Sequence, residues 1–179
     1  MRAGPSVLVC LDLQRGRLAG LIGAENVESA LVTCRHVLDQ ARRRRWPVLH
    51  VHRREPTLEG GRPIAGLEPL PSEPIYLRNG PSAFSHRAFS QAVEAYGGPL
   101  VLIGFSLCDS VLATAFAAVD RDLAVEVVSD GVPIGGRDDH LLRLAMAAPL
   151  ASLSPMARII DSRELFVEDA AALAAANAP

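Results

Sequence analysis

Asp12 is the first residue whose type and position could support chemistry. It lies near the end of Ser6–Leu13, an apolar segment that we interpret as a buried strand. A carboxyl group buried at the end of a strand is well placed for general acid or base catalysis. An aspartate in such a place also commonly caps the loop that follows, and this segment alone leaves both interpretations open.

A second candidate site lies between the apolar run Leu100–Ile103 and an alanine-rich segment that begins at Ser110. We predict a buried strand, a tight turn at Phe105–Asp109, a helix from Ser110 and a further strand at Val125–Val128. Ser110 would then lie at a helix N-terminus, where backbone N–H groups favour a developing negative charge, although serine there is also a frequent N-cap. Cys108 is either a reactive thiol or a packing residue. Ligands of open parallel sheets bind beyond the carboxyl ends of the strands, so we expect the function at this turn.

Three further side chains could bind a ligand, and each also has a simpler structural interpretation. Arg78 follows a short expected strand and could hold an anionic substrate, or it could be an ordinary surface arginine. His50 and His52 alternate along a strand and point to one face, yet no third ligand has an obvious spacing, so we predict no metal site. The glycine-rich segments do not follow a strand and precede a helix, so we predict no cofactor of the nucleotide type.

The elements that must position these residues alternate between strand and helix along the whole chain. This alternation predicts an α/β fold with a parallel sheet covered on both faces by helices, and we find no repeat or linker, so residues 1–179 are expected to form a single domain. The segment DLQRGRLAG after the first strand is predicted to be a loop. Glu55–Pro74 is predicted to be a long loop without regular structure, of the kind that covers a binding site. Further expected strands are Pro47–His52, Ile75–Leu77 and Ala157–Ile160, and expected helices are Glu25–Arg45, Phe84–Tyr96, Asp138–Ala147 and Val167–Ala176.

The composition is that of an ordinary soluble protein. Of the 179 residues, 49% are hydrophobic and 21% are charged, and the formal net charge is -2, which gives no reason to expect nucleic acid or a membrane as partner. All 18 basic residues are arginine, which excludes a catalytic lysine. Three cysteines, Cys10, Cys34 and Cys108, form neither a metal-binding nor a disulfide pattern, and no signal peptide is apparent, so we expect a cytoplasmic location.

Three motifs carry a resemblance to a known family. They are VLVCLDLQRG, LRNGPSAF and LIGFSLCDSVLATAFAAVDRDLAVEVVSDGV. Together and in this order they resemble the isochorismatase-like, or cysteine hydrolase, superfamily, which includes nicotinamidases, N-carbamoylsarcosine amidases, ureidoacrylate amidohydrolases and isochorismatases. The resemblance covers nearly the whole chain, and it implies a three-layer α/β/α domain of Rossmann-like type with a mainly parallel sheet of about six strands.

The resemblance also implies roles for individual residues, two of which depart from the family pattern. Asp12 matches the catalytic aspartate, whereas Ser110 stands where the family has its nucleophilic cysteine and Arg78 stands where it has a lysine. A cis peptide bond is implied between Phe105 and Ser106, together with an oxyanion hole formed by the N–H groups of Ser106 and Ser110. The residues implied to contact the substrate are Gln14, Phe84, Phe105 and Cys108.

These departures leave three functional interpretations, because a serine hydroxyl needs a well-placed base and an arginine does not exchange protons at neutral pH. In the first, a hydrolase acts on a small carboxylated molecule without a thiolate, by vinyl-ether-type or water-mediated cleavage. Asp12 is the acid or base, Arg78 holds the substrate carboxylate and Ser110 positions water or the substrate. In the second, Ser110, either native or in place of a cysteine, is the nucleophile of a small-molecule amidohydrolase. In the third, the chain is an inactive binding or scaffold member. The resemblance further implies a homodimer or homotetramer.

Overall fold

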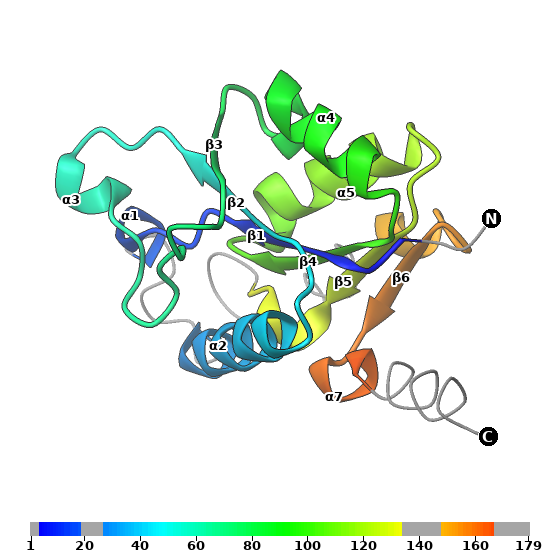
Figure 1. Cartoon of the computed structure of the whole chain (residues 1–179), viewed down its shortest axis with the longest axis horizontal. Helices are drawn as coiled ribbons and strands as arrows, with labels where there is room; N and C mark the ends of the chain where they lie inside the picture. The colour runs from blue at the N-terminus through cyan, green and yellow to red at the C-terminus, as the bar shows by residue number, and fades with distance from the viewer. Residues whose placement is uncertain (1–3, 19–26, 134–147, 167–179) are drawn as a thin grey trace.

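The computed structural model describes residues 4–18, 27–133 and 148–166 (Figure 1). These residues form an α/β fold in which helices cover both faces of a central sheet. The alternation of strand and helix predicted from the sequence is therefore confirmed. No helix among these residues is long and apolar enough to cross a membrane.

The sheet has six parallel strands in the order β3-β2-β1-β4-β5-β6. Its central strands, β1 (Val7–Leu11) and β4 (Leu100–Gly104), are buried along their whole length, as expected for apolar strands that lie between two layers of helices. The prediction of a mainly parallel sheet of about six strands is confirmed. The flanking strands are β2 (Val48–Arg53), β3 (Ile75–Arg78), β5 (Val125–Val128) and β6 (Ala157–Ile160).

Two apolar cores hold the helices to the sheet. On one face, α2 (Val27–Arg43) buries a stripe of small and branched side chains at helical spacing, and these pack against alternate residues of β1 and β4. On the other face, α4 (Arg87–Tyr96) and α5 (Leu112–Val119) pack against the remaining residues of the same strands. Figure 1 shows α2 on one side of the sheet and α4 with α5 on the other. The sheet is thus anchored from both faces.

Short helices occupy two segments that the sequence analysis assigned to loops. The first is α1 (Arg15–Leu18), and the second is α3 (Leu58–Gly61), so the prediction that Glu55–Pro74 lacks regular structure is wrong at α3. A local cap explains α3: the Thr57 hydroxyl accepts a hydrogen bond from the N–H of Gly60 over 3.0 Å. A helix of a single turn has too few apolar positions to show helical periodicity in the sequence.

The boundaries of two other helices also differ from the prediction. The expected turn at Phe105–Asp109 overlaps a π-helical segment (Leu107–Val111) that leads into α5 and is kinked at Asp109, whose backbone angles are not helical. The expected helix at Phe84–Tyr96 is divided at His86, which is extended and separates a 3₁₀ turn from α4. A short α7 (Ser162–Leu165) follows β6. The helices expected at 138–147 and 167–176, and the start of the one expected from residue 25, lie outside the described residues.

The strand order creates a crevice at the carboxyl ends of β1 and β4, because the chain leaves these neighbours toward opposite sides of the sheet. Asp12 directly follows β1 and has a φ of 50°, a left-handed conformation that aspartate tolerates better than most residues. Gly104 ends β4 with a φ of 123°, and a Cβ atom there would lie 2.0 Å from the carbonyl oxygen of Leu11. Glycine at this position lets the turn after β4 begin directly against the end of β1.

Candidate active site

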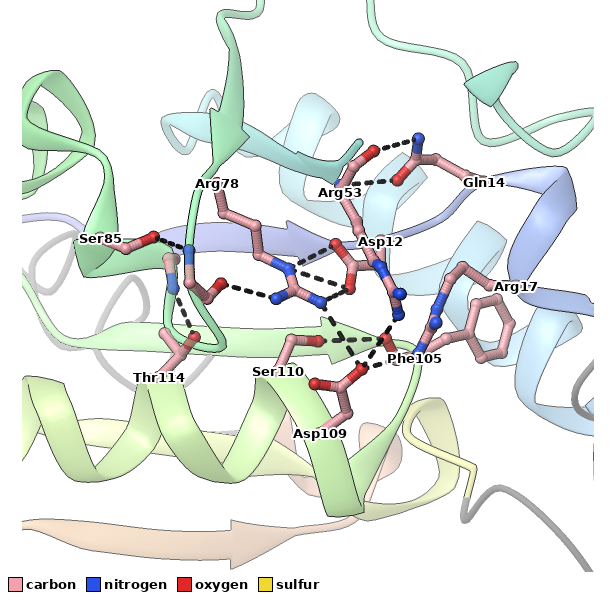
Figure 2. A network of polar contacts seen from close by, with 12 residues as sticks. Asp12, Gln14, Arg17, Arg53, Arg78, Ser85, Phe105, Asp109, Ser110 and Thr114 are labelled. Carbon is pink, nitrogen blue, oxygen red and sulfur yellow. Dashed lines mark hydrogen bonds and ion pairs between the residues drawn. The ribbon is translucent and has the colours of Figure 1, made fainter. Parts of the chain in front are cut away.

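Asp12 and Arg78 form a buried ion pair at the carboxyl ends of β1 and β3 (Figure 2). Nε of Arg78 donates to both carboxylate oxygens, over 3.1 and 3.2 Å, and Nη2 donates to Oδ2 over 2.6 Å. The side chain of Asp12 is fully buried and that of Arg78 is 6% exposed, so solvent screens their attraction little. Burial alone would lower the pKa of Arg78, but its hydrogen bonds and charge contact with Asp12 raise that pKa above the ordinary value. The guanidinium is therefore a permanent positive charge in the site.

The loop after β3 fixes Arg78 from its other side. Nη1 of Arg78 donates to the carbonyl oxygen of Gly80 over 2.7 Å. The hydroxyl of Ser85 accepts a hydrogen bond from the N–H of Gly80 over 2.9 Å, and the buried hydroxyl of Thr114 in α5 accepts one from the N–H of Ala83 over 3.0 Å. Figure 2 shows these contacts beside the ion pair. They limit the positions that the guanidinium can take.

A second carboxylate, that of Asp109, meets three arginines from different segments. Its Oδ2 lies 2.8 Å from Nη2 of Arg17 in α1, 3.5 Å from Nη2 of Arg78 and 3.9 Å from Nη1 of Arg53 at the end of β2. The Asp109 side chain is 33% exposed, whereas Asp12 is fully buried. The two carboxylates therefore form an inner and an outer layer around the guanidinium of Arg78.

An open cleft of about 380 Å³ lies over this arrangement. Its lining carries three positive side chains and one carboxylate, which favours the binding of an anion. Asp12 is fully buried and is not part of the lining, whereas its partner Arg78 is. The residues that line the cleft are Arg53, Arg54, Arg78, Asn79, Gly80, Pro81 and Asp109.

Ser110 lies in the π-helical turn after β4 and is fully buried. Its hydroxyl donates to the carbonyl oxygen of Phe105 over 3.1 Å, so its single proton is directed to a backbone acceptor and not to a base. The peptide bond between Phe105 and Ser106 is cis. Ser106 is also buried, and its carbonyl oxygen accepts the N–H of Asp109 over 3.1 Å. The turn thus places Ser106, Asp109 and Ser110 together beside the end of β1.

The other four residues expected to contact a substrate do not line the cleft. The Gln14 amide is engaged with the backbone: Nε2 donates to the carbonyl oxygens of Arg53 and Gly61, and Oε1 accepts the N–H of Arg53 over 2.8 Å. Phe84 and Phe105 are packed into the cores on opposite faces of the sheet. Cys108 is exposed. The structure therefore brings Asp12 and Arg78 into direct contact and gives Gln14 a role in tying α1 to the end of β2.

His50 and His52, the candidate metal pair, have ring centroids 6.3 Å apart. Nε2 of His50 lies 2.9 Å from the carboxylate of Glu73, which also receives two hydrogen bonds of 2.8 Å from Arg42. Across residues 4–18, 27–133 and 148–166, no group of three His, Cys, Asp or Glu side chains is arranged to hold a metal ion. Glu73 thus connects the segment before β3 to β2 through His50 and to α2 through Arg42.

The buried side chains of His52 and Glu73 predict that the free energy of unfolding falls in acid. Burial lowers the pKa of His52 to about 4, and hydrogen bonds from Arg42, Leu70 and His50 outweigh burial and lower the pKa of Glu73 to about 2. Groups with lower pKa values in the folded state stabilise it at higher pH, so stability falls from about pH 6.5 through His52 and from about pH 4.5 through Glu73. We expect a loss of roughly 2 kcal/mol between pH 7 and 4.5, measured by urea unfolding, and a smaller loss in His52→Asn. Equal losses in both proteins would contradict this.

The fold is a parallel α/β fold with a buried aspartate between β1 and β4, where the chain leaves toward opposite sides of the sheet. A comparison with protein families gives a match to such a fold. Residues 6–164 match the Isochorismatase domain, so the chain belongs to the isochorismatase family. An isochorismatase structure from Pseudomonas putida KT2440 is similar with a TM-score of 0.78 and 22% identity, and the match covers 92% of this chain and 93% of that one. No curated protein matches the chain.

Two other similar structures have different activities in their names. An N-carbamoylsarcosine amidase from Thermoplasma acidophilum has a TM-score of 0.72 and 20% identity, covering 88% of this chain and 96% of its own. The MAR1 ribonuclease from Caenorhabditis elegans has a TM-score of 0.77 and 19% identity, covering 93% of this chain and 82% of its own. At such identities the similarity shows the fold, and the activity must be inferred from the site.

Sequence reasoning missed the outer layer of the site. Arg53 directly follows His52 at the end of a predicted strand, and Asp109 lies beside Ser110 in a predicted turn. The rule that residues after parallel strands converge at one edge could have identified both. Arg17 gave no comparable signal, because α1 is a single turn within a segment interpreted as a loop.

Proposed function

We propose that this protein is a hydrolase that acts on a small carboxylated molecule without a thiolate. The observation that carries the proposal is the Asp12–Arg78 pair beneath an arginine-lined cleft. Arg78 uses the edge formed by Nε and Nη2 for Asp12, which leaves its Nη1–Nη2 edge for another group. A guanidinium edge matches the two oxygens of a carboxylate, so the substrate's carboxylate is held there.

The hydrogen bonds of Asp12 favour a role as base. A carboxylate offers about four lone-pair positions, and Arg78 occupies three of them, two at Oδ2 and one at Oδ1. The remaining position at Oδ1 accepts the proton of a water molecule as that water attacks the scissile centre. The bond to the leaving group then breaks, and the leaving group takes the proton from Asp12. This arrangement supports water-mediated cleavage over protonation of a vinyl ether, since the Asp12 carboxylate acts as the acceptor in all three hydrogen bonds from Arg78.

Ser110 fits the role of positioning a water or the substrate. Its hydroxyl donates a hydrogen bond to the carbonyl oxygen of Phe105, and its oxygen lone pairs can accept another hydrogen bond. The same hydrogen bond weighs against Ser110 as nucleophile, because no base accepts the hydroxyl proton in the described part of the chain. Backbone N–H groups of Ser106 and Ser110 would stabilise the oxyanion that forms on attack by water.

The test is turnover of a panel of small carboxylic acids that carry a hydrolysable ester, amide or enol ether group, followed by mass spectrometry. We expect Asp12→Asn to lose about 100-fold in kcat, within the range for general-base groups, and Ser110→Ala to lose less than about 10-fold. Asp39→Asn, an exposed change of the same type in α2, serves as the control and should retain full activity. Circular dichroism verifies that each variant is folded.

Two outcomes would contradict the proposal. If Ser110→Ala abolished turnover and an acylating probe labelled Ser110, the protein would be an amidohydrolase with a serine nucleophile. If carboxylates bound but the wild type turned over no member of the panel, the protein would be a binding member of its family.

A further inference from the structure

The second edge of Arg78 faces a carboxylate that belongs to the chain itself. Of its five N–H groups, two are bound by Asp12 and one by the carbonyl oxygen of Gly80, which leaves one on Nη1 and one on Nη2. Oδ2 of Asp109 lies 3.5 Å from Nη2, which is longer than an ordinary charge-assisted hydrogen bond. Asp109 therefore lies close to the Nη1–Nη2 edge of Arg78 without forming a full hydrogen bond with it.

Asp109 is held mainly by another arginine. Its short contact is the 2.8 Å hydrogen bond from Nη2 of Arg17, and Arg53 is 3.9 Å away. The carboxylate can thus stay on Arg17 when a second anion enters between Arg53 and Arg78. Its 33% exposure places it at the wall of the cleft and not beneath it.

Among the described residues, the positive charges at the cleft outnumber the negative ones. In this part of the chain, Arg53, Arg54 and Arg78 line the cleft, and Arg17 lies beside it on Asp109. Three carboxylates oppose them, namely Asp12, Asp109 and Glu55, the last acting on Arg78 only through its charge. Arg54 lines the cleft and has no ion pair with any residue that the structure describes. A carboxylate that enters the cleft would therefore meet an excess of positive charge among the described residues.

We propose that Asp109 is an internal competitor that occupies the edge of the ligand's carboxylate site in the free protein. A small-molecule carboxylate takes the position between Arg53 and Arg78. The Asp109 carboxylate then moves away from these two arginines and keeps its hydrogen bond with Arg17. This inference rests on the proposed function for its ligand class, and it adds that Arg53 binds the ligand and that Asp109 limits its affinity. The ligand is assigned as a carboxylate because that is the class in the proposed function, and phosphate is the other anion that a guanidinium edge can bind.

The test measures binding by isothermal titration calorimetry with malonate as the probe, and it needs no turnover. Removal of the competing charge in Asp109→Asn is expected to tighten malonate binding about 10-fold, and Arg53→Gln to weaken it about 10-fold. Asp39→Asn changes net charge equally at a distant exposed site and should leave the affinity unchanged. Malonamide, which has the shape without the charge, should not bind, and inorganic phosphate should bind less tightly than malonate.

A second variant separates competition from simple support of the arginines. In Arg17→Gln the Asp109 carboxylate loses its main partner and moves toward Arg53 and Arg78, so we expect malonate binding to weaken about 10-fold. If Asp109 only positioned the arginines, Asp109→Asn would weaken binding, and this result would overturn the inference. Equal gains in Asp109→Asn and Asp39→Asn, equal binding of malonamide, or tighter binding of phosphate would also overturn it.

The outcomes distinguish this inference from the proposed function. Tighter malonate binding in Asp109→Asn, with no turnover of any substrate, would support the carboxylate site and overturn the hydrolase. Turnover that depends on Asp12, with malonate binding unchanged in Asp109→Asn, would support the hydrolase and overturn the role of Asp109.

Discussion

Arg78→Met is expected to destabilise the protein by about 3 to 5 kcal/mol, the cost of leaving a buried charge without its partner. Methionine retains the apolar stem of arginine, so packing changes little, but Asp12 loses all three hydrogen bonds to its side chain. Asp12 is fully buried, so its carboxylate would be left without the donors that offset its burial. The measurement is the free energy of unfolding from urea titration at pH 7.

Two further variants identify the cause of that loss. Arg62→Met removes an arginine that is 65% exposed and forms an ion pair with the exposed Glu59, and it should change stability by less than about 0.5 kcal/mol. Combining Asp12→Asn with Arg78→Met removes the stranded charge, so the double variant should be more stable than Arg78→Met alone. Equal losses in Arg78→Met and Arg62→Met would show that the buried pair contributes nothing.

Gly104→Ala should cost about 2 to 5 kcal/mol, because two penalties act at one residue. A φ of 123° is unfavourable for any residue with a Cβ atom, and that atom would lie 2.0 Å from the carbonyl oxygen of Leu11 in the neighbouring strand. To relieve the contact, β4 must move away from β1 at the point where the site begins. We therefore expect a lower free energy of unfolding and, in the protein that remains folded, weaker turnover.

Two other glycines separate these penalties. Gly97 also has a positive φ, of 65°, but no atom lies within 4 Å of its added Cβ, so Gly97→Ala should cost only about 1 kcal/mol. Gly61 has neither a positive φ nor a close neighbour, and Gly61→Ala should be nearly neutral. Urea unfolding of the three variants should rank their losses in the order Gly104, Gly97, Gly61, and any other order would contradict the close approach of β4 to β1.

Most of the fold could be predicted because each central strand is a local signal. Runs such as Leu100–Ile103 are apolar at every position, which is the pattern of a strand buried on both faces, and the helices that follow repeat at 3.6 residues. The short helices were missed for the opposite reason. In α3 a single hydroxyl cap stabilises one turn, and in the segment Leu107–Val111 the helix begins with a π-helical turn that has no periodicity of its own.

The sequence by itself determined where three polar side chains stand relative to the predicted elements: Asp12 lies near the end of one strand, Arg78 follows another and Ser110 follows a turn. Only the tertiary structure decided which of them meet. Asp12 and Arg78 are 66 residues apart, and the sheet order brings both strand ends to one edge. The same convergence gathers arginines from α1, β2 and β3 around Asp109. These contacts depend on side-chain direction and on which donors remain free, properties that no local pattern in the sequence contains.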